Sequence, residues 1–192
     1  MSAAPRLGTE RGSLRDRYLA APDFPAMLGA VRQNVELWPA MWRYAKVDEA
    51  FVRRVAVLPG AWHLLVLSED WCGDAVNTVP FVAKLAERSP NADLRVLGRD
   101  ANPDLMNSHL TGSSRSIPIV IALDESFQER GWWGPRPTAL QRWASGQGQL
   151  LEKSARYREA RIWYARDHGR TTLEEVVSML ERAAARGPGA PV

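Results

Sequence analysis

The feature that most constrains the fold of this chain is a short, almost uninterrupted apolar run at residues 62–67. A run of this length without apolar–polar alternation is typical of a strand buried on both faces, as in a parallel sheet. A helical apolar pattern follows at residues 71–88, and a second short strand pattern at residues 94–97. Two strands joined by a helix predict a parallel pair with a crossover connection, so we expect an α/β protein.

The rest of the sequence adds a hairpin and flanking helices. Residues 117–123 and 128–132 are strand patterns separated by the turn residues Asp124 and Glu125, which predicts an antiparallel hairpin. Pro39 is expected to kink or split the helix that contains it, because proline lacks an amide hydrogen. The expected helices are residues 13–20, 25–46, 48–58, 71–88, 102–110, 154–168 and 171–186, and one that begins near residue 137.

The chain length of 192 residues corresponds to about one domain. Thr171 with Glu174, or Thr172 with Glu175, offers a capping box at the start of the last helix. We predict a disordered leader (1–12), a single domain (13–186) with its core at 62–146 and helical extensions at 13–58 and 154–186, and a frayed tail (187–192).

The charge pattern does not favour a nucleic-acid partner. The formal net charge is +3, from 25 basic and 22 acidic residues that are spread along the chain. Basic and aromatic side chains are mixed at residues 156–166, as on some nucleic-acid-binding surfaces. The acidic residues Glu159 and Asp167 interrupt this pattern, so we interpret the stretch as a solvated helix face. No apolar run reaches the length of a signal peptide or a membrane span. We expect a cytoplasmic protein without a nucleic-acid or membrane partner; its oligomeric state stays open.

Cys72 is the chain's one cysteine, which excludes an intramolecular disulfide and any zinc site built on two thiolates. The three histidines, His63, His109 and His168, are too scattered along the sequence to replace the missing thiolates. We therefore expect no metal site and no cofactor.

Four short motifs occur in order at the expected strand ends: residues 69–75 (Glu-Asp-Trp-Cys-Gly-Asp-Ala), 100–103 (Asp-Ala-Asn-Pro), 115–118 (Arg-Ser-Ile-Pro) and Gly134. They resemble the Trp-Cys-Gly-Pro-Cys active site, the Asp-x-Asn-Pro turn, the Arg-Gly-Ile-Pro signature and the hairpin glycine of thioredoxins. The resemblance implies a thioredoxin-like fold: an α/β fold with a four-stranded mixed sheet flanked by helices, here with N-terminal and C-terminal helical extensions. It also implies a cis-Pro118 that faces Cys72.

Within that superfamily, the chain is similar to a bacterial subgroup of single-cysteine proteins. These proteins share a Trp-Cys-x-Asp-Ala motif, a Gly-Pro-Arg-Pro segment (here residues 134–137) and a helical N-terminal extension. The resemblance implies that the strand at residue 62 is central, parallel to the strand at 94 and antiparallel to the strand at 117.

The departures from the family pattern limit the chemistry. Ala75 stands where thioredoxins carry the second cysteine, and a dithiol exchange needs that thiol to resolve the mixed disulfide. Val66 replaces the buried acid of the family, and Asp74 replaces the proline of its active site. Ordinary thioredoxin turnover is therefore excluded.

The local charges oppose ionisation of Cys72. A helix N-terminus stabilises a thiolate by about 0.3–1 kcal/mol. Glu69, Asp70 and Asp74 are close in sequence, and each would cost roughly 0.5–2 kcal/mol. We expect a thiol pKa near or above the unperturbed value of about 8.5.

Two functions stay open. The first is a monothiol redox protein in which Cys72 exchanges with a protein or small-molecule thiol or disulfide, or is capped by a small thiol. The alternative is a non-catalytic peptide- or ligand-binding module that uses the groove beside Cys72. The candidate catalytic residues are Cys72 and Pro118, and the candidate groove residues are Trp71, Gly73, Asp74, Ile117, Gly134 and Arg136.

Two side-chain roles have alternatives of their own. Arg136 either reaches an anionic ligand or pairs with a carboxylate such as Asp74 or Asp70. Trp71, Trp132 and Trp133 either form an aromatic wall around the site, or at least one of them packs against the added helices.

Overall fold

The computed structural model describes residues 12–186, which form a four-stranded sheet in the order β2-β1-β3-β4. The central strand β1 pairs in parallel with β2 and antiparallel with β3, and β3 pairs antiparallel with β4. The strands are β1 Trp62–Ser68, β2 Ala92–Gly98, β3 Ile119–Leu123 and β4 Glu129–Trp133. The predicted strand order and the thioredoxin-like fold class are confirmed. The expected leader and tail lie, except for Gly12, outside the described residues.

The two middle strands are the most deeply buried part of the fold. All five residues of β3 are buried, and Leu64, Leu65, Val66 and Leu67 of β1 have no exposed surface. This burial explains why the apolar run of β1 does not alternate with polar residues: helices or loops cover both faces of the sheet.

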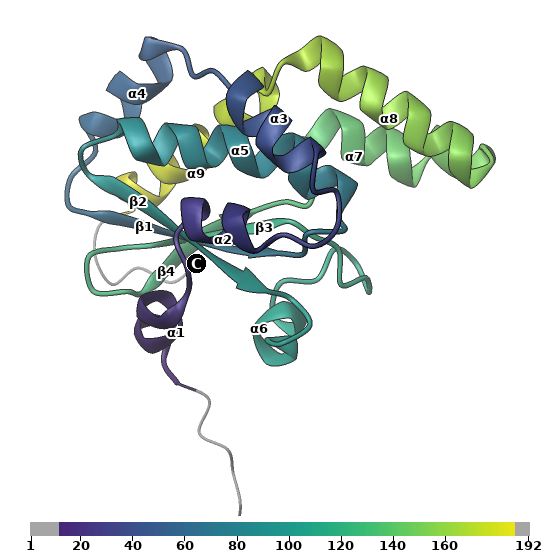
Figure 1. Cartoon of the computed structure of the whole chain (residues 1–192). Helices are drawn as coiled ribbons and strands as arrows, with labels where there is room; N and C mark the ends of the chain where they lie inside the picture. The colour runs from purple at the N-terminus through teal and green to yellow at the C-terminus, as the bar shows by residue number, and fades with distance from the viewer. Residues whose placement is uncertain (1–11, 187–192) are drawn as a thin grey trace, which may run out of the picture.

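Helices lie on both sides of the sheet (Figure 1). In that view α3, α4, α5 and α9 lie above it, and α1 and α6 below it. The helices are α1 Leu14–Ala20, α2 Phe24–Ala30, α3 Leu37–Tyr44, α4 Glu49–Ala56, α5 Gly73–Arg88, α6 Pro103–Asn107, α7 Thr138–Ser145, α8 Lys153–Asp167 and α9 Arg170–Ala185, with a 3-10 turn η1 at Gln147–Leu150.

The predicted helix at residues 25–46 is wrong as a single element, and its break does not lie at Pro39. The chain leaves the helix at residues 31–36, where the amides of Arg32 and Gln33 donate to Oδ2 of Asp70 at 2.7 and 2.9 Å. Those two amides are thus bonded to a side chain that is distant in the sequence. Pro39 lies in the first turn of α3, where a missing amide hydrogen costs nothing.

The predicted capping box of the last helix is also wrong. α9 begins at Arg170, one residue before Thr171 and two before Thr172, and its N-cap is Gly169, which has no side chain to cap the helix. The amide of Thr171 instead donates to Oδ2 of Asp167 at 3.0 Å. Gly169 has φ +74°, and a Cβ there would lie 2.3 Å from the ring of Phe81, so glycine is required by both conformation and space.

The extensions contribute to the core of the sheet. Trp38 of α3 and Val55 of α4 have no exposed surface, and Val176 of α9 is equally buried. α9 packs on β4 and α5, and α3 packs on α5. Arg54 of α4 holds α9 through a two-bond contact with Glu181, both bonds 2.8 Å long.

Candidate functional site

Cys72 lies between the end of β1 and the first residue of α5, for which it is the N-cap. The residue is 7% exposed, and its thiol donates a hydrogen bond to the carbonyl oxygen of Ile117, with Sγ and O 3.4 Å apart. The Ile117–Pro118 peptide bond is cis, as predicted, and a second cis bond joins Gly134 and Pro135. The strand-to-helix junction therefore brings the thiol against the segment that precedes β3.

Burial raises the pKa of the Cys72 thiol to about 11. The backbone amides of Ala75 and Asp74 and the charge of Arg136 lower it, while the charge of Asp74 raises it further. The predicted direction is confirmed, but the main cause is desolvation and not the three carboxylates.

Two of those carboxylates are turned to other partners. Asp70 accepts the amides of Arg32 and Gln33, and Glu69 accepts the amide of Asp100 at 2.9 Å. Of the three acids, Asp74 is the one whose charge raises the pKa of the thiol.

Asp74 is the centre of a polar network beside the thiol. Its Oδ2 is 2.6 Å from Nη2 of Arg136, and its Oδ1 accepts a hydrogen bond from the hydroxyl of Tyr164 at 2.9 Å. Arg136 also donates to Oε1 of Gln141 at 2.9 Å. The predicted pairing of Arg136 with Asp74 is thus present. Burial and the charge of Asp74 hold the pKa of Tyr164 well above its ordinary value, so Tyr164 stays a hydrogen-bond donor.

A cavity of about 540 Å³ opens beside Cys72. Six of the eight predicted site residues line it, namely Trp71, Cys72, Gly73, Asp74, Ile117 and Arg136. A second hollow of about 390 Å³ shares Asp74, Ser116, Arg136, Tyr157 and Ala160 with the first. We call the two together the Cys72 groove.

Pro118 and Gly134 do not line the Cys72 groove. Pro118 is buried, and Gly134 lies against its carbonyl group: a Cβ on Gly134 would be 2.2 Å from the oxygen of Pro118. With φ +135°, Gly134 also has a backbone conformation that favours glycine. Both residues therefore form the support behind the groove wall.

Of the three tryptophans considered for an aromatic wall, one lies at the groove and two lie away from it. Trp71 is 40% exposed on the groove, and the guanidinium of Arg99 lies 4.9 Å from its ring centre. Trp133 is buried and donates to Oε2 of Glu175 at 2.8 Å, while Trp132 contacts His109 edge-on. There is no aromatic wall made of all three.

One stripe of α8 supplies groove residues that the sequence reading did not identify. Lys153, Tyr157, Ala160, Arg161 and Tyr164 recur at three- and four-residue steps and line the cavity together. Residues 156–166 are therefore not solvated on every face. The sequence predicts a helix here, but it does not predict which face of the helix lines the cavity, because that depends on where α8 packs.

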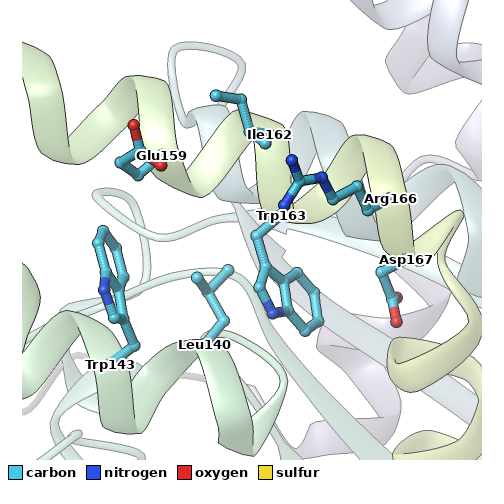
Figure 2. A pocket seen from close by; sticks show the side chains of 7 residues that line it. All are labelled: Leu140, Trp143, Glu159, Ile162, Trp163, Arg166 and Asp167. Carbon is cyan, nitrogen blue, oxygen red and sulfur yellow. The ribbon is translucent and has the colours of Figure 1, made fainter.

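Another hollow, of about 390 Å³, lies between α7 and α8, with Trp143 and Trp163 on its two sides and Leu140 between them (Figure 2). Its two acidic residues have partners within the protein, because Asp167 bonds to Thr171 and Glu159 lies 3.7 Å from Arg158. None of the predicted site residues reaches it, so the candidate site is the Cys72 groove.

Residues 12–186 show neither a metal-binding cluster nor a membrane-spanning helix. No group of three or more histidine, cysteine, aspartate or glutamate side chains is arranged to hold a metal ion. None of the helices in this range combines the length and the apolar character needed to span a membrane.

Comparison with known proteins agrees with this geometry. A family model described as thioredoxin, Thioredoxin_9, matches residues 21–156, whereas no curated protein matches the chain. A solved structure of a Pseudomonas aeruginosa protein of unknown function is 21% identical, with a TM-score of 0.71, over 90% of this chain and 99% of its own. An HIV epitope scaffold is 22% identical, with a TM-score of 0.67, over 88% of this chain and 98% of its own. These two structures show a shared fold, and the family match over most of the chain shows that it belongs to this thioredoxin family, as a member with a single cysteine.

Proposed function

We propose that the protein is a non-catalytic binding module of its family, which takes a small ligand in the Cys72 groove. The observation that carries the proposal is a thiol that is buried and protonated although it lies beside an open cavity. The fold keeps the position of a thioredoxin active site, but the residue at that position is not set up as a nucleophile.

The pKa of Cys72 argues against thiol–disulfide exchange. With a thiol pKa of about 11, only about one thiol in ten thousand is ionised at pH 7. The thiolate is the attacking species, and Ala75 leaves no second thiol to release a mixed disulfide.

The size and lining of the groove favour a small molecule. Ligand sites of this class have volumes of roughly 300–1,000 Å³ and combine apolar walls with a few polar groups. The larger hollow has about 540 Å³ and joins Trp71, Leu37 and Val76 to charged and hydroxyl side chains.

The monothiol redox protein is the second candidate. Its support is the place of Cys72 at the start of α5, where the amides of Asp74 and Ala75 and the charge of Arg136 favour a thiolate. A partner that widened the groove would weaken the opposing effect of burial.

Exchange assays separate the two candidates. The wild-type protein and Cys72→Ser are compared for insulin reduction with dithiothreitol and for mixed-disulfide formation with glutathione disulfide, followed by mass spectrometry. We expect the same insulin rate for both proteins and negligible glutathionylation at pH 7. Turnover that depends on Cys72 would reject the binding module and favour the monothiol protein.

A further inference from the structure

We infer that the ligand of the Cys72 groove is an organic oxyanion: a molecule that carries a phosphate or carboxylate group on an apolar or aromatic body. This inference rests on the proposed function and adds the chemical class of the ligand. It follows from the charges, the exposed rings and the shape of the groove.

The groove has a strong excess of positive charge. Its basic residues are Arg99, Arg115, Arg136, Lys153, Arg156 and Arg161, and its one acidic residue is Asp74. The charge of Asp74 is balanced by Arg136 at 2.6 Å. A chain whose net charge is only +3 therefore gathers several uncompensated cations around one cavity.

Most of these cations have no protein carboxylate as a partner. Within residues 12–186, no ion pair joins an acid to Arg115, Lys153, Arg156 or Arg161. Arg99 pairs with Asp100, whose side chain is 65% exposed, so solvent screens that contact. Arg115 donates through Nε to Oδ1 of Asn107 at 2.9 Å. Its two terminal guanidinium nitrogens and the guanidinium groups of Arg156 and Arg161 thus remain available for an external oxyanion.

Three separate segments supply the cations other than Arg136. Arg99 and Arg115 come from the loops that follow β2 and precede β3, whereas Lys153, Arg156 and Arg161 come from α8. Like charges that share a cavity repel each other, and an anion between them converts this repulsion into attraction. Guanidinium groups also match the geometry of phosphate and carboxylate, with two parallel hydrogen bonds.

The apolar lining indicates an organic body and not a bare inorganic ion. Tyr157 is 50% exposed and Trp71 is 40% exposed, and both rings line the groove together with Leu37 and Val76. Exposed apolar surface gathered in one hollow is typical of a binding site. A flat ligand can contact these rings while its anionic group reaches the arginines.

The test measures binding of four probes to the full chain by isothermal titration calorimetry. Phenyl phosphate and benzoate carry the two anionic groups, benzyl alcohol is the uncharged analogue, and inorganic phosphate lacks the ring. We expect at least one of the two aromatic anions to bind more tightly than both benzyl alcohol and inorganic phosphate, and more weakly as salt rises. Which of the two binds identifies the oxyanion as a phosphate or a carboxylate.

The variant for this test is the double substitution Arg115→Gln and Arg161→Gln. We expect it to weaken binding of the aromatic anion by about tenfold or more. The matched control is the double substitution Arg158→Gln and Arg182→Gln, which removes the same number of charges at positions outside the groove, and it should leave binding unchanged. Circular dichroism of each variant establishes that the fold is retained.

The outcomes also separate this inference from the proposed function. Equal binding of benzyl alcohol and the anions, no binding of any probe, or anion binding that both variants keep would each overturn the oxyanion inference. The proposed function fails on a different result, which is disulfide exchange that depends on Cys72. Binding of single-stranded DNA to the protein, measured in the same way, with no binding of the small anions, would likewise count against an organic oxyanion.

Discussion

Cys72 is subject to two opposite physical effects, and their magnitudes decide its protonation. The N-terminus of a helix stabilises a negative charge by about 0.3–1 kcal/mol, or up to about 2 kcal/mol at a partly buried site. A pKa that rises from 9.0 to about 11 corresponds to a net penalty of about 3 kcal/mol on the thiolate. Desolvation therefore outweighs the helix, because Cys72 is 7% exposed and its thiol hydrogen is bonded to Ile117.

This balance predicts slow alkylation of Cys72 at neutral pH. The rate with iodoacetamide should rise about tenfold per pH unit until the pH approaches 11. Asp74→Asn removes the acid that raises the thiol pKa and leaves Arg136 without its partner, so the alkylation rate at pH 8 should increase by several-fold or more. The rates are measured by mass spectrometry of the intact protein.

Glu69→Gln is the control for this experiment, because Glu69 bonds to the amide of Asp100, whereas Asp74 is the acid whose charge raises the pKa of the thiol. The rate of this variant should match that of the wild type. A wild-type thiol pKa of about 6 would contradict the account and support the monothiol protein.

The sequence predicts much of this site at the level of single residues. The place of Cys72 follows from the resemblance to the thioredoxin motif, and the direction of its pKa follows from the charges near it in the sequence. The pairing of Arg136 with Asp74 is one of the alternatives that the sequence leaves open, and the structure selects it. The sequence cannot rank the effect of burial on the thiol pKa above that of the three acids, because the burial of Cys72 depends on contacts with segments distant in the chain, such as Ile117. The cations of α8 were missed for the same reason.

At the scale of elements, the contact between α6 and β4 depends on His109. Its Nδ1 is 2.7 Å from the carbonyl oxygen of Leu105, and its Nε2 is 3.0 Å from Oε1 of Glu129. Both neighbours are acceptors, so both ring nitrogens donate when the imidazole is protonated. Burial alone would lower the pKa of His109, but Glu129 and Leu105 reverse this and raise it.

A histidine whose pKa is raised in the folded state stabilises the fold below its unfolded pKa of about 6.5. That stabilisation is lost as the pH rises through the folded pKa. We therefore expect the free energy of unfolding, measured with urea, to fall over this pH window. Glu129→Gln should remove the fall, since burial then dominates.

Glu159→Gln provides the comparison, because it removes one acid from an exposed position on α8. Its pH dependence should follow that of the wild type. A fall of the same size in Glu129→Gln would show that His109 is not responsible.

The errors of sequence reading at this scale also have physical causes. The spacing of apolar residues predicted helix over residues 25–46, but the break comes from Asp70, which takes two amides of the chain at residues 32 and 33. A capping pattern at Thr171 or Thr172 was present, yet the close packing of Gly169 on Phe81 sets the start of α9. Both features depend on contacts between distant segments.

At the scale of the whole molecule, both extensions hold the segment that carries Cys72. From the N-terminal side, Asn34 and the indole of Trp38 donate to the carbonyl oxygen of Asp70, each at 2.9 Å. From the C-terminal side, Tyr164 donates to Asp74. The apolar pattern of the extensions predicted that they cover the sheet, and the structure adds that they fix the two ends of the Trp71–Gly73 turn.

Removal of residues 1–58 should therefore abolish cooperative folding. The deletion takes away Tyr18, Phe24, Trp38, Val52 and Val55, all of which are buried. Burial of a large apolar side chain contributes about 1.5–3 kcal/mol, so their combined loss is comparable to the net stability of a typical domain, about 5–15 kcal/mol. We expect a chain that aggregates or unfolds in urea without a sigmoidal transition, measured by tryptophan fluorescence and circular dichroism. A soluble remainder with a cooperative transition would show that residues 59–192 form an independent domain, and that the N-terminal helices are an accessory to it.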